Sequence, residues 1–120
     1  MINQILSENI EIKAMSHITG GGIPENLPRC MPSEFIPYIN TSSWEIPILF
    51  KFLKDKGSIP EIDFWNTFNL GVGFCLIIDK QFKEEILNIC KDHDIDSWEI
   101  GKIVRKNDST ISKFLLEILT

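Results

Sequence analysis

Apolar residues in the first eighteen positions recur first at the spacing of a helix and then at every second residue, as in a strand. The change between the two spacings separates the first two expected elements. Apolar residues within 2–8 recur at helical spacing, which predicts a short helix. Residues 10–18 alternate between apolar and polar, which predicts a strand that runs directly into three glycines. Pro24 suits the first position of a short helix through Leu27, which the prolines after it would end.

Two helices are expected in the middle of the chain, after a short strand over residues 35–40. A cluster of threonine and serine precedes Pro47, which opens a helix through about Lys56 that the next glycine ends. A second helix is expected from residues 59–61 through about Phe68. Its apolar face comprises Ile62, Trp65 and Phe68.

The last third of the chain predicts a strand, a helix and a further strand that pack as one unit over residues 74–104. Residues 74–78 form a continuous apolar run, which is typical of a central strand buried on both faces. Residues 80–91 predict a helix and residues 98–104 a strand, whereas periodicity does not decide between strand and short helix for residues 110–119. The inward side chains expected on the helix are Phe82, Ile86, Leu87, Ile89 and Cys90.

Helices grouped between strands favour the α+β class, with helices packed on a mixed or antiparallel sheet. The chain has 120 residues, of which 43% are hydrophobic and 24% are charged. A chain of this length and composition can bury a core as a single domain, residues 1–120, without disulfides or metal ions. The sequence contains no internal repeat and no low-complexity segment.

The net charge of the chain limits the kinds of molecule that it is expected to bind. Twelve basic and seventeen acidic residues give a net charge of −5, which argues against a nucleic-acid-binding surface. A phosphorylated small molecule remains compatible, because backbone amides bind phosphate without positive side chains. Charged residues interrupt every long apolar run, so we expect no membrane partner and no signal peptide, and we interpret the chain as cytoplasmic.

The three cysteines, Cys30, Cys75 and Cys90, are widely spaced and form no grouped motif with histidine. We interpret them as reduced, mostly buried thiols, and we expect no metal site among them. None has a base close to it in the sequence, so no nucleophile is proposed and the catalytic residues stay unassigned.

The first candidate for ligand binding is the run of glycines at residues 20–22, between a strand and a helix. Without Cβ atoms, the backbone can adopt positive φ there and a ligand can approach closely. The amides that open the next helix favour an anion, and Thr19, Asn26 and Arg29 add hydrogen-bond donors. A phosphate cradle and a flexible glycine turn both explain the pattern, which matches neither the Walker nor the dinucleotide fingerprint.

Other residues near the glycines carry weaker signals. His17, directly before them, could move a proton or bind a ligand, but the residues alone favour a histidine satisfied within its strand. Residues 69–73 form a second glycine loop beside the apolar run, and there the residues favour a turn with closely packed backbones. The three tryptophans are expected in the core, and His93 at a solvated helix end.

Four segments occur in a recognisable order. They are KAMSHITGGGIPENLPR at 13–29, SSWEIP at 42–47, TFNLGVGF at 67–74 and WEIGKIV at 98–104. Together they closely resemble the signature of the phosphoribosylformylglycinamidine cyclo-ligases, also called aminoimidazole ribonucleotide synthetases. The resemblance covers residues 12–104, whereas residues 1–10 and 105–120 depart from the pattern.

The resemblance implies an ATP-dependent ligase of de novo purine biosynthesis, which uses ATP and Mg²⁺ to cyclise formylglycinamidine ribonucleotide to aminoimidazole ribonucleotide. ATP would phosphorylate the formyl amide oxygen, and a nitrogen of the same substrate would then close the ring. The resemblance also implies the fold of the family's C-terminal domain and a homodimer for the full-length enzyme. The residues that it places at the substrate- and phosphate-binding cleft between domains are His17, Thr19, Gly20, Gly21, Gly22, Asn26, Arg29, Asn69, Gly71 and Gly73.

The family enzyme has an N-terminal domain longer than this chain, which carries the main groups for ATP and Mg²⁺. We therefore expect the chain to be a partial C-terminal domain, a truncated product or a gene fragment, and inactive alone. Apolar surface should be exposed where the absent elements would pack, and self-association could cover it. Two alternatives are another member of the same ATP-using superfamily, from which the HITGGG and SSW segments point away, and a non-catalytic folded remnant or assembly module.

Overall fold

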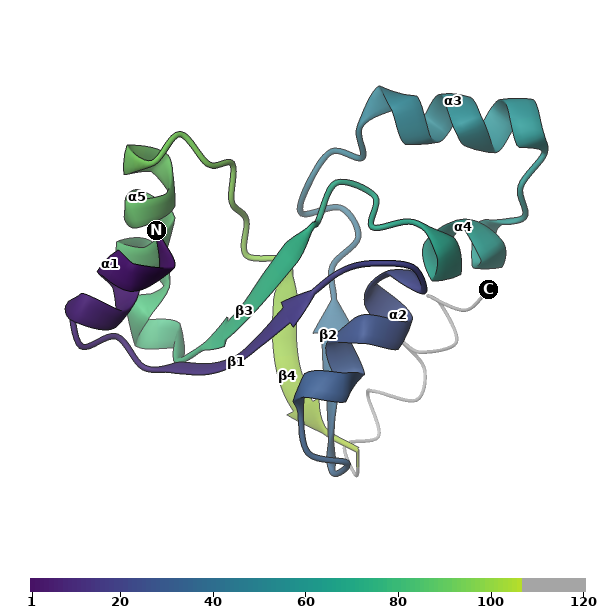
Figure 1. Ribbon diagram of the computed structural model, residues 1–120. Helices are drawn as coiled ribbons and strands as arrows, with labels where there is room; N and C mark the ends of the chain where they lie inside the picture. Colours follow the sequence, from purple (N-terminus) through teal and green to yellow (C-terminus); the bar gives the residue numbers. More distant parts are fainter. Residues whose placement is uncertain (107–120) are drawn as a thin grey trace.

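The computed structural model describes residues 1–106 (Figure 1). Its elements, in chain order, are α1 (Ile2–Ser7), β1 (Ile12–His17), α2 (Gly22–Asn26), the 3-10 turn η1 (Leu27–Cys30), β2 (Phe35–Ile39), α3 (Ile48–Gly57), α4 (Glu61–Thr67), β3 (Phe74–Ile78), the 3-10 turn η2 (Lys80–Phe82), α5 (Lys83–Asp92) and β4 (Gly101–Arg105). Each helix and strand expected within this range is present. The element expected over residues 110–119 lies outside the described residues.

The four strands of residues 1–106 form two antiparallel sheets of two strands each. β1 pairs with β3, which places His17 opposite Phe74, and β2 pairs with β4, which places Ile39 opposite Gly101. A Cβ at Gly101 would overlap the Tyr38 carbonyl oxygen, so this pairing needs a glycine there. The α+β class with antiparallel pairing is confirmed.

Apolar side chains gather in two clusters, and β3 contributes to both. Because successive strand residues point to opposite faces, Cys75 and Ile77 join the first cluster while Leu76 and Ile78 join the second. The buried members of the first cluster are Ile18, Ile23, Leu27, Ile39, Trp44, Val72 and Cys75. Those of the second are Ile5, Ile10, Ile86, Ile89 and Cys90.

The expectations for β3 are wrong in two respects. It is not a central strand, because it pairs with β1 alone and Phe74 at its start is exposed. Nor do residues 74–104 form one packing unit, since β3 and β4 lie in different sheets. The apolar run has another physical cause: each face of this strand packs against a different hydrophobic cluster.

The expected apolar face of α4 is wrong at Ile62, whereas Trp65 packs against the first cluster and Phe68 is half-buried. Phe64 is the buried residue of this helix, and Ile62 is exposed to solvent. At its contact with α2, the carbonyl oxygens of Trp65 and Phe68 face the backbone of Gly22. Phe64 and Trp65 are the side chains of α4 that pack into the protein.

Smaller differences concern the ends of elements. Pro28 does not end the chain's helical path, because η1 continues it as a 3-10 turn through Cys30. Ser58, not Gly57, takes the left-handed conformation after α3, with φ of 48°. Trp98 precedes β4 and is exposed, so it is not a core residue as expected.

Candidate functional site

The two glycine loops meet at one end of the β1–β3 sheet. The first loop, residues 19–22, follows β1, and the second loop, residues 69–73, precedes β3. Because these strands are antiparallel, the end of one lies beside the start of the other. The Ile18 amide donates a hydrogen bond of 2.9 Å to the Gly73 carbonyl, which closes the pairing at the loops.

The glycines of the first loop differ in what surrounds them. Gly21 and Gly22 have φ of 101° and 64°, in the left-handed region that favours glycine. A Cβ at Gly22 would overlap the Trp65 carbonyl oxygen and lie 2.9 Å from that of Phe68. Gly20 has no atom within 4 Å of the position that a Cβ would take. The first loop therefore packs through Gly22 and is open at Gly20.

Asn26 holds the first loop together. Its side chain is buried, with 7% exposure, and its Nδ2 donates to the carbonyls of Thr19, Gly20 and Gly22 at 3.2, 3.2 and 2.8 Å. Its Oδ1 accepts a hydrogen bond of 3.3 Å from the Thr19 hydroxyl. Both ends of the amide are thus occupied by the loop itself.

Ser16 is a contributor that the sequence reasoning missed. It is buried in β1, and its hydroxyl donates a hydrogen bond of 3.1 Å to the Asn26 carbonyl. Its position in the sequence could have identified it. Residues 10, 12, 14, 16 and 18 lie on one side of the strand, and Ser16 is the polar member of that set. A polar residue at an inward position needs a partner, and here the partner is the residue that holds the loop.

The second loop is braced by the segment that follows β2. The Trp44 indole nitrogen donates a hydrogen bond of 3.0 Å to the Leu70 carbonyl, and both residues are buried. A Cβ at Gly71, where φ is 97°, would lie 2.7 Å from Pro47 Cδ. Asn69 caps its own turn by accepting a hydrogen bond of 3.0 Å from the Gly71 amide. The SSWEIP segment therefore supports the TFNLGVGF loop mechanically.

The exposed groups around the paired loops are those that a ligand could reach. His17 is exposed at the end of β1, and its ring centroid lies 6.3 Å from that of Phe74. Gly73, like Gly20, has no atom within 4 Å of a Cβ position. Backbone at Gly20 and Gly73, the His17 imidazole and the Phe74 ring are thus accessible beside the two loops.

Arg29 is already occupied by a neighbour in α2. Its guanidinium pairs with Glu25, four residues earlier, and both side chains are exposed. The Glu25 carboxylate also lies against Gly21, because a Cβ there would overlap Glu25 Oε2. A carboxylate, absent from the expected set of site residues, therefore sits beside the glycine loop where an anion would approach.

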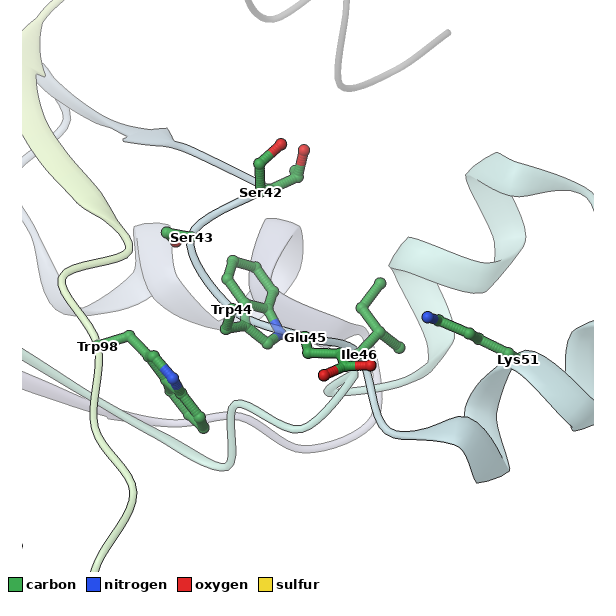
Figure 2. A pocket seen from close by; sticks show the side chains of 8 residues that line it. Ser42, Ser43, Trp44, Glu45, Ile46, Lys51 and Trp98 are labelled. Carbon is green, nitrogen blue, oxygen red and sulfur yellow. The ribbon is translucent and has the colours of Figure 1, made fainter.

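A surface pocket of about 540 Å³ lies near the bracing segment (Figure 2). Its lining residues are Thr41, Ser42, Ser43, Trp44, Glu45, Ile46, Lys51 and Trp98. Figure 2 shows Trp98 and Lys51 on opposite sides of the segment that carries Trp44. The Ser43 hydroxyl is used locally, because it donates a hydrogen bond of 2.7 Å to the Asn40 carbonyl.

The thiols and acids of residues 1–106 do not build a metal centre. Within this range no cluster of three or more histidine, cysteine, aspartate or glutamate side chains could hold a metal ion. Cys75 and Cys90 are buried and Cys30 is half-buried. Burial raises the pKa of the Cys75 thiol to about 11 and also raises that of Cys30. In the same range, no helix is long and apolar enough to span a bilayer.

The chain has an α+β fold in which two glycine loops meet at the end of a small antiparallel sheet, held there by the buried side chains of Asn26 and Trp44. The chain belongs to the family described as AIR synthase related protein, C-terminal domain, whose model matches residues 1–113. This match extends beyond the resemblance over residues 12–104 at both ends. The family resemblance read from the sequence is confirmed.

Relatives with the same name are found in several strains of one organism. A protein of Prochlorococcus marinus strain MIT 9312, named phosphoribosylformylglycinamidine cyclo-ligase, is 91% identical over all 120 residues, which cover 35% of its length. Its namesake in subspecies pastoris strain CCMP1986 is 70% identical over 119 residues, or 34% of its length. That of strain MIT 9313 is 44% identical over 110 residues. The chain thus spans about a third of the length of the curated relatives it matches.

Proposed function

We propose that the chain is part of the C-terminal domain of a cytoplasmic phosphoribosylformylglycinamidine cyclo-ligase and supplies substrate-binding loops to it. The whole enzyme would use ATP to cyclise formylglycinamidine ribonucleotide to aminoimidazole ribonucleotide. The observation that supports this most directly is the meeting of two glycine loops, fifty residues apart in sequence, at one end of the β1–β3 sheet. The names of the relatives support the choice of reaction.

The expected site residues fall into two groups, those that would contact the ligand and those that would shape the loops. Gly20, Gly73 and His17 would contact the ligand, because the glycines are open and the histidine is exposed, whereas the Thr19 hydroxyl and carbonyl are already used by Asn26. The loop-shaping residues would be Gly21, Gly22, Asn26, Asn69 and Gly71, whose conformations or hydrogen bonds are used within the loops. Arg29 would reach an anion only after leaving Glu25.

These residues would bind and orient the ribonucleotide. Because the attacking nitrogen and the activated carbon belong to one molecule, the residues would act by holding that molecule in the conformation that brings the two atoms together. Phosphorylation of the formyl amide oxygen turns it into a leaving group, and ring closure forms the carbon–nitrogen bond as phosphate departs. Because no cluster of three or more histidine, cysteine, aspartate or glutamate side chains gathers within residues 1–106, we assign the main Mg²⁺ ligands to the part of the enzyme outside this chain.

The experiment that tests this function measures ADP release that depends on formylglycinamidine ribonucleotide. The chain is assayed alone and again with the other two thirds of the strain MIT 9312 relative supplied as a separate polypeptide. We expect turnover only when both are present, and a much lower rate with His17→Ala. His93→Ala is the matched control, because His93 contacts Gln4 rather than either loop.

A second candidate function is a non-catalytic folded remnant or assembly module. The observation that favours it is the row of exposed apolar side chains on α3, since an exposed apolar surface is typical of a module that assembles with a partner. Absence of turnover with both polypeptides present would support this candidate over the enzyme. Turnover from the chain alone would contradict the placement of the main ATP and Mg²⁺ groups elsewhere.

A further inference from the structure

The carboxylate of Glu25 lies directly on the first glycine loop. A Cβ at Gly21 would overlap Glu25 Oε2 and lie 2.6 Å from Glu25 Cδ, so the side chain folds back onto the glycine. Gly21 has φ of 101°, and its lack of a side chain leaves the room that the carboxylate fills. The loop thus carries a negative charge next to Gly20, the glycine that is open to a ligand.

The backbone that carries Glu25 is fixed, whereas its side chain is exposed to solvent. α2 packs beside α4, as Figure 1 shows, with Gly22 against the carbonyl oxygens of Trp65 and Phe68. The next residue, Asn26, donates to three carbonyls of the loop. The Glu25 side chain itself is 53% exposed. The fold therefore sets where this carboxylate lies, while its partner can be exchanged.

The partner of Glu25 within the chain has a particular chemistry. It is the guanidinium of Arg29, a planar cation whose N–H groups match the two oxygens of a carboxylate. Both side chains are more than half exposed, and an ion pair in contact with water is weak. A ligand that brings a similar planar cation can therefore replace Arg29.

The substrate of the proposed reaction carries such a cation. Formylglycinamidine ribonucleotide contains an amidine, which is a strong base and is protonated in neutral water. A protonated amidine is planar and donates N–H groups in the arrangement of one edge of a guanidinium. The same molecule bears a phosphate, the anion that Arg29 would bind once it leaves Glu25. Substrate and protein would thus exchange ionic partners with each other.

We infer that Glu25 is a substrate-recognition residue, whose carboxylate binds the amidinium of formylglycinamidine ribonucleotide in place of the Arg29 guanidinium. This inference rests on the proposed function, because the amidine belongs to the substrate of that reaction. It adds the group that distinguishes this substrate from the corresponding amide, in which an oxygen replaces one nitrogen of the amidine. A carboxylate pairs with an amidinium but repels an amide oxygen, since both oxygens are acceptors.

The first test uses the chain itself, with acetamidinium chloride as the probe and neutral acetamide as the reference of similar shape. Nuclear magnetic resonance of the Gly20 and Gly21 amides follows binding. In Arg29→Ala, Glu25 loses its competing partner, so affinity for acetamidinium should rise about threefold or more. Adding Glu25→Gln to Arg29→Ala should reduce the response to that of acetamide. Adding Glu34→Gln instead, at another exposed glutamate, should leave it unchanged.

The second test measures KM and kcat for the chain mixed with the other two thirds of the strain MIT 9312 relative. Glu25→Gln should raise KM for formylglycinamidine ribonucleotide about fivefold or more and change kcat less, because a binding contact is lost. Glu34→Gln should change neither. A general charge effect has the opposite sign, since removing a carboxylate beside the loop would tighten binding of any anion and lower KM.

Equal binding of acetamidinium and acetamide to Arg29→Ala would overturn the inference, as would acetamidinium binding that persists without Glu25. Either result would leave Glu25 as a helix-stabilising partner of Arg29. An unchanged or lower KM in Glu25→Gln, with turnover intact, overturns the recognition role alone. Acetamidinium binding that requires Glu25, in a mixture that shows no turnover, overturns the proposed function and leaves a site for a planar cation.

Discussion

Asn26 and Glu25 are neighbours in α2 with opposite relations to the first glycine loop. Asn26 points inward and donates to three carbonyls of the loop, so its amide is part of the loop's structure. Glu25 points outward, against Gly21, and holds the guanidinium of Arg29. Asn26 is therefore part of the structure of the candidate site, whereas the Glu25 carboxylate lies where an anion would bind.

Replacing Asn26 should therefore destabilise the fold. Asn26→Ala removes the donor shared by three buried or half-buried carbonyls, and the expected loss in free energy of unfolding is about 1–3 kcal/mol. Urea denaturation followed by circular dichroism measures it. Asn88→Ala on the exposed side of α5 is the control and should change stability by less than about 0.5 kcal/mol. Equal effects of the two substitutions would contradict the role given to Asn26.

Replacing Glu25 should instead improve anion binding. Glu25→Gln removes a negative charge beside Gly21 and releases Arg29, so affinity for inorganic phosphate should rise about three- to tenfold at low salt. The gain should shrink as salt is raised, because both side chains are exposed. Titration followed by nuclear magnetic resonance of the Gly20 and Gly21 amides measures the affinity. Glu34→Gln, at another exposed glutamate, is the matched control and should leave it unchanged.

The buried thiol of Cys75 should make stability depend on alkaline pH. Its pKa is raised from 9.0 to about 11 in the folded chain, chiefly by burial, so the folded state keeps a proton that the unfolded state loses. This contribution is fully present below pH 9 and is lost as pH rises through 11, on the order of 2–3 kcal/mol. Urea denaturation between pH 8 and pH 11 measures it. In Cys75→Ala this part of the decline should be missing, and an identical pH profile would refute the assignment.

At the scale of elements, the support of one loop by another segment is the main finding. Trp44→Phe keeps a ring in the first hydrophobic cluster but loses the hydrogen bond to the Leu70 carbonyl. We expect a loss of about 1 kcal/mol in stability and faster hydrogen exchange at the Val72 amide, which closes the same turn. Trp98→Phe, at an exposed tryptophan, should leave that exchange rate unchanged. Slowed or unchanged exchange in Trp44→Phe would show that the loop does not depend on this contact.

Local sequence patterns predicted each α-helix and strand of residues 1–106, but not the 3-10 turn η1, because period and turn residues act over a few positions. They did not predict which strands pair. The apolar run at 74–78 has the same appearance in a central strand as in a strand that serves two clusters, so its neighbours could not be deduced. The glycines likewise marked two loops, but their meeting depends on the β1–β3 pairing. Ser16 and Glu25 matter through their contacts with Asn26 and Gly21, which period and spacing do not reveal.

At the scale of the whole molecule, β3 joins the two hydrophobic clusters, so we expect them to unfold together. Leu27→Ala in the first cluster and Ile89→Ala in the second should each lower stability by about 2–4 kcal/mol. Each should still give a single thermal transition by fluorescence and by circular dichroism. Two separated transitions in either variant would mean that the clusters are independent units.

The amide of Asn26 has a consequence for the thermodynamics of ligand binding. Because three carbonyls of the first loop are already tied to one buried side chain, the loop is pre-organised in the free protein. Little conformational entropy is then left to lose when an anion arrives, and the binding enthalpy reports new contacts rather than the ordering of the loop. If the hydrogen bonds of the Asn26 amide were weakened, the loop would have to become ordered when the ligand binds. The entropy loss that opposes binding would then be larger, and association would be slower.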